Sequence, residues 1–552
     1  MAGAFGVSPG WQWLRAVLQA RGVRAIAYTA YRLVVRCCDR LLRGAFPEGP
    51  PRREAEAMRA AESGDYRPTA RLFLRALGLV YLIVFASLAV QVHLLIGSDG
   101  LLPVRDFLAG DQGDGISRFW RFPTLFWLWD GDVAVRGGTI LGLALALGLT
   151  IGWHSKSCLA GLWLLFLSYV TVGRDFFWFQ WDNLLVESTT LALLLPASPA
   201  VAPHPWVVFL FRWLLFRLLF ESGLAKVQGG VQSWLPLTAM AYYYETAPLP
   251  SLGGWYAHQL PLWIHRWTSA LTLLGELLGP LLIWGPRGAR RLAFVMYAGF
   301  QIAIQATANY GYFNILSLVI SLFLLDARDL AWLPQRVVGA HATPHANGPA
   351  QGARVPALRW LVGGAAWVIF LLTVLELMVL VAGPGVAASR VLVAVREIYL
   401  PFRVVSKYHL FAAIDPNRVE AEIQWTMDGQ EWRPYHFHYK PGPLHRAPPI
   451  VAPHQPRVDF QLWFFTLGRD GGSHAYFNTL VRRLCTQPAR VQQLFEQDSF
   501  PERPPGAIRV AYYRYGMVDL ATRDRAGIYW MRELLGYSPQ GYPCDAPAPP
   551  RF

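Results

Sequence analysis

Charged side chains are scarce in this chain of 552 residues, and lysine is nearly absent. Asp, Glu, Lys and Arg make up 16% of the sequence, whereas soluble domains contain roughly 25%. Only four lysines occur, so arginine carries nearly all of the net charge of +14. With 54% hydrophobic residues, the composition excludes an ordinary soluble protein and predicts an integral membrane protein with soluble appendages. We expect the basic excess to set membrane topology and contact anionic lipids, and we expect no nucleic-acid partner.

Several catalytic and metal-binding motifs are missing as well. The chain has no HExxH, no GxSxG, no P-loop and no GxGxxG that opens a helix after a strand, so hydrolase and nucleotide-dependent functions lose support. Its five cysteines form no CxxC pair, and His436 and His438 share one face of a predicted strand without an acidic or cysteine partner nearby. We therefore expect no metal site and no cofactor. Cys485 and Cys544 could form a disulfide if their domain lies outside the cytoplasm, but their spacing leaves this open.

Apolar runs suited to crossing a bilayer recur along the middle of the chain and predict about nine membrane spans. Three arginine-rich segments should lie in the cytoplasm: the N-terminus, residues 285–291 and the stretch from Arg328 to Arg359. Nine spans satisfy all three positions when the N-terminus is inside. The expected spans cover residues 72–96, 137–153, 158–173, 183–197, 206–226, 268–285, 291–308, 312–325 and 358–382.

The expected fold is an α-helical multi-pass membrane bundle followed by a small soluble α+β domain. Residues 1–70 are predicted to form a basic amphipathic segment on the cytoplasmic side. Residues 71–385 form the membrane domain, whose loop at 227–267 should be extracytoplasmic. Residues 386–552 should then form an extracytoplasmic domain.

This last domain is predicted to be rich in β structure in its first half. Residues 418–426 alternate polar and apolar side chains, and the pair Asp428-Gly429 that follows is a strong hairpin turn. Residues 458–468 and 477–495 are predicted to be helical. Residues 507–518 are predicted to form another strand.

Charged residues inside predicted spans cost roughly 2.5–3.5 kcal/mol each on insertion scales, so they require partners or a function. Arg217 and Glu221 are four residues apart on one helix face, and we expect them to form a buried ion pair. Lys226 should face elsewhere; it either snorkels to the interface or acts as a base at the mouth of a polar cavity. Other polar residues expected within the membrane are Asp182, Glu187, Glu276 and Asn309.

The predicted extracytoplasmic loop at 227–267 is dense in aromatic residues and is the expected client- or ligand-facing surface. Its candidate contact residues are Tyr244, Glu245, Trp255 and His258. Aromatic residues near a membrane also pack at the lipid interface without binding a partner, and that alternative stays open for this loop.

Long motifs in two parts of the chain resemble the lipase maturation factor family. They are AYYYETAPLPSLGGWYAHQLP at 241–261 and ANYGYFNILS at 308–317, and further along WRPYHFHYKPG, PHQPRVDFQLWFFTLG and FPERPPGAIRVAYYRY. The resemblance implies a multi-pass membrane protein that helps dimeric lipases fold and assemble, in the endoplasmic reticulum in eukaryotic relatives. Richness in Arg, Ala and Gly indicates a bacterial-type member in the plasma membrane; a eukaryotic member would lie in the endoplasmic reticulum membrane. SKYHLF at 406–411 departs from the family pattern and implies a different client.

A shorter likeness concerns Lys226. SGLAKVQGGVQSW at 222–234 is similar to the helix that carries the lysine base in vitamin K-dependent γ-glutamyl carboxylases. The likeness implies a common membrane fold and would place Lys226 at the position of that base.

The sequence is consistent with three functions. We favour a non-enzymatic maturation factor in the lipid bilayer that acts on exported clients, with lipases implied by the family resemblance. The alternatives are an intramembrane carboxylase-like enzyme that uses Lys226 as its base, and a transporter, which the lack of internal repeats disfavours. The sequence indicates no particular oligomeric state.

Overall fold

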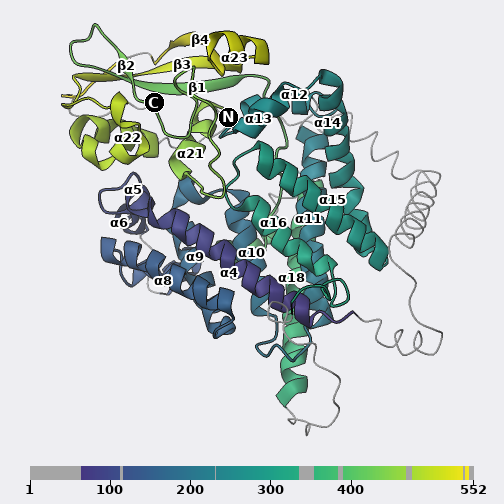
Figure 1. The fold of residues 1–552 in the computed structure, drawn as a ribbon. Helices are drawn as coiled ribbons and strands as arrows, with labels where there is room; N and C mark the ends of the chain where they lie inside the picture. Colours follow the sequence, from purple (N-terminus) through teal and green to yellow (C-terminus); the bar gives the residue numbers. More distant parts are fainter. Residues whose placement is uncertain are drawn as a thin grey trace.

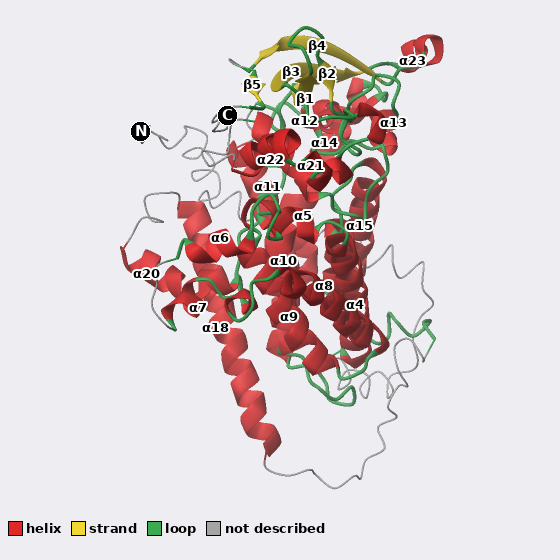
Figure 2. Ribbon diagram, turned by 90° about the vertical axis from the view of Figure 1, so that its left-hand side faces the viewer, coloured by secondary structure: helices red, strands yellow, loops and turns green. Residues whose placement is uncertain are grey.

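A helix bundle makes up most of the molecule, and a small β-sheet with its own helices lies across one end of it (Figure 1). The computed structural model describes residues 64–111, 116–229, 232–334, 354–382, 390–467, 475–538 and 541–545. Almost all of the amphipathic segment expected over residues 1–70 lies outside these described residues. Figure 2 shows the sheet at the top and one long helix, α18, extending away from the opposite end of the bundle.

Five helices in the described part of the chain are long and apolar enough to cross a membrane. The expected count of nine spans is therefore not supported. The five are α4 (Arg67–Ala89), α8 (Asp132–Ile151), α9 (Ser155–Val172), α14 (Leu262–Leu277) continued by η3 (Gly279–Trp284), and α18 (Arg354–Ala382).

The other four expected spans fall on helices that are too short or too polar by these criteria. Helix α10 (Gln180–Leu193) has 14 residues, and α16 (Phe313–Ser321) with η4 (Leu322–Leu324) is similarly short. Helix α11 (Pro205–Gly229) has 25 residues but carries four charged side chains, and α15 (Arg287–Thr307) is amphipathic. Several apolar runs were thus counted as separate spans, although the helices they form are too short or too polar to cross a membrane by these criteria.

Glycine allows the first two long helices to pack closely. Helices α4 and α8 run antiparallel, with Gly78 against Thr150 and Gly142 against the ring of Phe85. A Cβ atom built at Gly142 would lie 2.5 Å from that ring, so any larger residue would force the helices apart. The contact places α4 and α8 as a packed pair on one side of the bundle (Figure 1).

Shorter helices connect the long ones. On the N-terminal side these are α5 (Val92–Ile96), α6 (Val104–Ala109), α7 (Ser117–Arg121), η1 (Leu125–Trp127) and η2 (Arg174–Phe177). Two more, α12 (Ala239–Thr246) and α13 (Leu252–His258), belong to the loop expected at 227–267 and lie beside one end of the sheet (Figure 1). Helix α20 (Arg390–Tyr399) and η5 (Leu400–Phe402) lead from α18 to the C-terminal domain.

The C-terminal domain contains an antiparallel sheet in the order β2-β1-β3-β4, with β5 also paired to β3. The predicted hairpin is confirmed: Trp425 of β1 pairs with Arg433 of β2 across the Asp428-Gly429 turn, where Gly429 has a φ of 79°. The strands are β1 (Arg418–Thr426), β2 (Arg433–Pro434), β3 (Ala507–Met517), β4 (Trp530–Tyr537) and β5 (Tyr542–Pro543). The helices are α21 (Arg457–Thr466), α22 (Ala475–Thr486) and α23 (Leu520–Ala526), with η6 (Pro488–Arg490), η7 (Gln492–Leu494) and η8 (Gln497–Ser499).

The expectation that β structure concentrates in the first half of this domain was wrong. Strand β2 is only two residues long, so β1 finds its full-length partner in β3, from Arg418 opposite Tyr515 to Thr426 opposite Ala507. Strands from both halves of the domain therefore build one sheet. The disulfide between Cys485 and Cys544, which the sequence left open, joins α22 to the residue after β5.

The two parts of the molecule share one hydrophobic core. Helix α21 lies between the sheet and the bundle (Figure 1), and its Phe460 packs against Phe179 and Trp181, with ring centroids 4.9 and 5.3 Å apart. A single continuous cluster of buried apolar residues runs from α4 to β5. The domain therefore packs on the bundle as an integral part of the fold.

Candidate functional site

Buried charges in the bundle bind the segment that leads into the C-terminal domain. The Arg217 guanidinium on α11 donates to Glu187 on α10, and also to the carbonyl of Ser406 at 2.9 Å. Its predicted partner Glu221 is present as well, 3.9 Å away. Glu187 accepts from the Tyr408 hydroxyl at 2.7 Å, and Glu221 accepts from the Tyr408 backbone N–H at 2.8 Å. The expected pair is thus part of a larger network that holds residues 406–408 inside the bundle.

Lys226 lies at the next turn of α11, and its side chain is only 1% exposed. The Lys226 Nζ donates to Glu276 Oε1 on α14 at 2.9 Å and to the Leu410 carbonyl at 2.8 Å. It also lies 5.1 Å from the centre of the Trp234 ring. The interpretation of Lys226 as a residue that snorkels to the interface was wrong, because residues 410 and 411 and helix α14 cover this end of α11.

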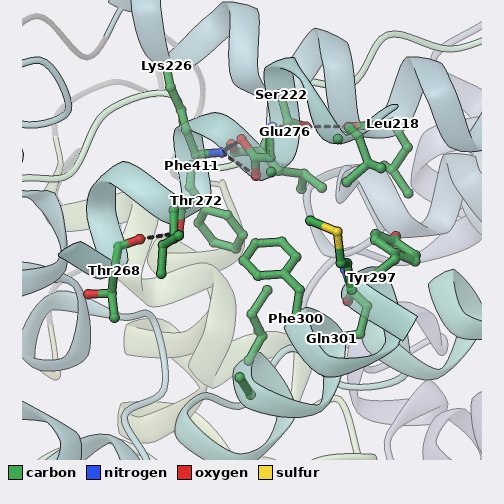
Figure 3. Close-up of a pocket in the computed structure, with 18 of the residues that line it drawn as sticks. Leu218, Ser222, Lys226, Thr268, Thr272, Glu276, Tyr297, Phe300, Gln301 and Phe411 are labelled. Atoms are coloured by element: carbon green, nitrogen blue, oxygen red, sulfur yellow. Dashed lines mark hydrogen bonds and ion pairs between the residues drawn. The ribbon is translucent and has the colours of Figure 1, made fainter. Parts of the chain in front are cut away.

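A cavity of about 400 Å³ opens beside this ion pair (Figure 3). Helices α11, α12, α14, α15 and α16 contribute its walls, together with Leu410 and Phe411. Most of the lining side chains are aliphatic or aromatic. The polar ones include Lys226, Glu276 and Gln301. This volume and composition are typical of sites for small apolar ligands.

Another buried ion pair fixes helix α21 to the bundle. Both nitrogens of the Arg457 guanidinium donate to the Asp182 carboxylate on α10, each at 2.9 Å. Arg457 also donates to the Phe176 carbonyl at 2.6 Å, and Asp182 accepts from the Tyr312 hydroxyl. A bidentate pair sets orientation as well as distance, so α21 is held in one position on α10.

Asn309, just before α16, joins three chain segments. Its amide nitrogen donates to the carbonyls of Pro250 at 3.1 Å and Pro449 at 2.9 Å. Its amide oxygen accepts from the backbone N–H groups of Val451 and Ala452. Asn309 was expected as a polar residue inside the membrane; the structure places it where the bundle meets the C-terminal domain.

The four residues expected to face a client instead contact the rest of the protein. Tyr244 lines the cavity, and Trp255 is fully buried against the C-terminal domain in a cluster with Tyr515 and Trp530. Glu245 accepts from the Met517 backbone N–H at 2.7 Å, and His258 lies 3.7 Å from the same carboxylate. Burial raises the pKa of Glu245 and lowers the pKa of His258. Their side chains secure α12 and α13 against the sheet.

The polar face of β1 carries a further buried cluster. The Glu420 carboxylate accepts a hydrogen bond from Arg418 and lies 2.8 Å from the Lys440 ammonium. Although burial alone would raise the pKa of Glu420, these two cations hold it below its usual range. Arg418 also donates to the Glu245 carbonyl at 2.9 Å, which ties β1 to the end of α12. Burial raises the pKa of the neighbouring Asp459 to about 7, although Lys440 opposes this shift. Polar and apolar side chains therefore alternate along β1, and both the apolar face and the polar face of the strand are buried.

The partners of these charges could not be predicted from the sequence, because each lies far away along the chain. Glu276 is 50 residues from Lys226, and Arg457 is 275 residues from Asp182. One signal was available for Arg457, which lies inside PHQPRVDFQLWFFTLG, one of the stretches that carry the family resemblance; Tyr408 lies in SKYHLF, which departs from the family pattern.

The geometry favours a structural role for the buried charges of the helix bundle. Each of them faces an opposite charge or a backbone group of another segment, and Lys226 directs its hydrogen bonds at a carboxylate and a carbonyl. Within the described residues, no three His, Cys, Asp or Glu side chains converge to hold a metal ion.

Comparison with known proteins agrees with both parts of the fold. The model of the lipase maturation factor transmembrane domain matches residues 68–332, and that of the lipase maturation factor C-terminal domain matches residues 404–539. Lipase maturation factor 2 of Mus musculus is 31% identical over 84% of this chain and 82% of its own length. Lipase maturation factor 1 of Bos taurus is 30% identical over 89% of this chain and 92% of its own. No solved structure matches the chain. Similarity of this extent, across membrane bundle and sheet alike, shows that the chain belongs to the lipase maturation factor family.

Proposed function

We propose that this protein is a membrane-bound maturation factor that helps exported lipases fold and assemble, and that its C-terminal domain is the part that contacts the client. Family membership supports the maturation role, and the names of the relatives supply the class of client. The observation that carries the proposal is the way in which buried charges hold the C-terminal domain on the bundle. A surface presented in a fixed orientation to partly folded chains loses little entropy on binding.

Strand β4 is the best candidate for the client contact. It is an edge strand of the sheet, and among the described strands it pairs only with β3. Its side chains Met531, Leu535 and Tyr537 are exposed. An exposed, apolar edge strand readily accepts another strand, which adds to the sheet through backbone hydrogen bonds. Partly folded lipase subunits would offer such strands.

The C-terminal domain and the arginine-rich end of α15 belong on opposite sides of the membrane in this proposal. Arg287 and Arg291 bind Asp329 at the end of α15 that is distant from the sheet (Figure 1). Arginine-rich ends favour the cytoplasm, whereas the Cys485–Cys544 disulfide is typical of an oxidising compartment. Five spans, like nine, are an odd number, so the N-terminal and C-terminal ends of the chain lie on opposite sides of the membrane. The compartment would be the exterior of a bacterial plasma membrane or the lumen of the endoplasmic reticulum.

Site-specific photocrosslinking with a co-expressed lipase tests the client surface. A benzoylphenylalanine at position 535 of β4 should crosslink to the newly made lipase, whereas the same group in place of exposed Met427, in the β1–β2 turn, should not. Equal crosslinking from both positions, or none from position 535 while the lipase still matures, would contradict the assignment of β4.

The enzyme and transporter alternatives are not favoured. A carboxylase-like base at Lys226 would need a free lone pair facing its substrate, but this nitrogen is bound to Glu276 and Leu410.

A further inference from the structure

We propose that the cavity beside Lys226 binds an uncharged single-chain lipid with a terminal hydroxyl group, which enters sideways from the bilayer. This site is separate from the client surface on β4, and it does not depend on which protein the client is.

The cavity opens on the outer surface of the bundle. Leu271 on α14 and Met296 on α15 both line it, yet they are 61% and 47% exposed. Further apolar side chains beside them, Leu274 and Val295, are exposed on the same two helices. Because α14 belongs to a segment apolar enough to span the membrane, this face meets lipid tails. The entrance therefore communicates with the bilayer.

The walls select an apolar chain. Leu218, Leu219, Ile283, Phe300 and Phe411 line much of the space; the rings of Phe300 and Phe411 lie near each other in Figure 3. Lipid tails already lie in an apolar medium, so entry of a chain brings little hydrophobic gain. Selectivity must then come from polar groups at the inner end of the cavity.

The charge at the inner end favours a neutral headgroup. Lys226 and Glu276 lie 2.7 Å apart and cancel each other. A fatty-acid carboxylate or an ammonium lipid would add a third charge without a counter-ion, which is costly in a region of low dielectric constant. An uncharged polar group avoids this cost.

Gln301 indicates that the headgroup donates a hydrogen bond. It lines the cavity from α15, it is 2% exposed, and its Oε1 has no hydrogen-bond partner within the described structure. An acceptor left unpaired in a buried site costs free energy that a donor from a ligand would recover. A hydroxyl group on the lipid supplies this donor.

Two glycines on the α14 side provide a way to close the cavity without disturbing the fold. A Cβ atom built at Gly275 or Gly279, both of which line the space, would meet no atom within 4 Å. The same holds for Gly364 on α18, which does not line the cavity. Gly275→Leu should therefore fill the site, and Gly364→Leu is the matched control because it makes the same change in a membrane helix.

The test uses the purified full-length protein in lipid nanodiscs and a photoreactive probe, hexadecanol with a diazirine on its chain. We expect labelling to map by mass spectrometry to α14 and α15 at the cavity wall. Gly275→Leu should abolish this labelling, and Gly364→Leu should leave it unchanged. Labelling that persists in Gly275→Leu would show that the probe marks only the lipid-facing surface and would overturn the proposal.

Gln301→Leu tests the headgroup. We expect it to reduce labelling by the alcohol probe about tenfold, which corresponds to one hydrogen bond of about 1.4 kcal/mol, while the thermal midpoint is retained or raised. The matching fatty-acid probe should label the native cavity less than the alcohol does. Stronger labelling by the fatty acid, or equal alcohol labelling in Gln301→Leu, would overturn the choice of an uncharged hydroxyl lipid.

Discussion

Lys226 on α11 and Glu276 on α14 form a buried ion pair in the wall of the cavity, with 2.7 Å between Nζ and Oε2. The same ammonium holds the Leu410 carbonyl of the segment that enters the C-terminal domain. One charged contact therefore joins two helices and the connection to the sheet.

Removing one partner of the Lys226–Glu276 pair should destabilise the protein strongly. Lys226→Met leaves Glu276 as an unpaired buried charge, which costs about 3–5 kcal/mol. The double variant Lys226→Met/Glu276→Leu should recover most of this loss, because it leaves no buried charge. Thermal unfolding in detergent, followed by size-exclusion chromatography, measures both. Additive losses in the double variant would show that the two residues do not interact.

Lys226→Arg separates a structural lysine from a catalytic one. A guanidinium keeps the charge and can reach Glu276, since the cavity beside it has room, so client maturation should continue at close to its normal level. A base at this position would be lost, because arginine cannot accept a proton at working pH. The readout is the active fraction of a co-expressed lipase, with Lys156→Arg, outside the cavity lining, as the control. A folded Lys226→Arg protein without activity would favour an enzyme.

Asp182→Asn should loosen the C-terminal domain on the bundle. The change leaves the buried Arg457 without its carboxylate, at a cost of about 3–5 kcal/mol. Limited proteolysis should then cut near α21 much faster than in the native protein. Glu533→Gln is a suitable control, because its partner Arg514 lies on the exposed surface and such pairs contribute less than about 1 kcal/mol. Unchanged cleavage in Asp182→Asn would mean that the ion pair does not hold this domain.

Asp459 should make stability fall as the pH rises from about 4 to about 7. Its pKa is raised from 3.8 to about 7 in the folded protein, so in this window the folded state binds more protons than the unfolded state. Unfolding then becomes easier with rising pH, by at most about 1.4 kcal/mol per pH unit for one group. Asp459→Asn should flatten this slope, whereas Asp524→Asn, an exposed aspartate on α23, should not. Thermal unfolding at a series of pH values measures the slope; an identical slope in Asp459→Asn would contradict the assignment.

Local chemistry made some of these features predictable from sequence. The Asp428-Gly429 hairpin follows from turn preferences, and the proximity of Arg217 and Glu221 follows from their spacing on one helix. The partners Glu276, Ser406 and Arg457 did not follow, because tertiary packing alone brings them to their charges. The number of spans was overestimated because α10 and α16 are apolar but short, and α11 is long but charged. The residues expected to face a client pack within the protein: the C-terminal sheet covers Trp255 and contacts Glu245, while Tyr244 lines the cavity.

The most direct test of the maturation role follows one exported lipase in cells that lack this protein and in cells in which it is restored. Pulse labelling gives the amount of lipase made, and enzymatic assay gives the fraction that becomes active. We predict equal synthesis in both, with an active fraction that falls several-fold without the protein and returns when it is restored. An active fraction that stays the same in its absence, for every exported lipase of the host, would contradict the account.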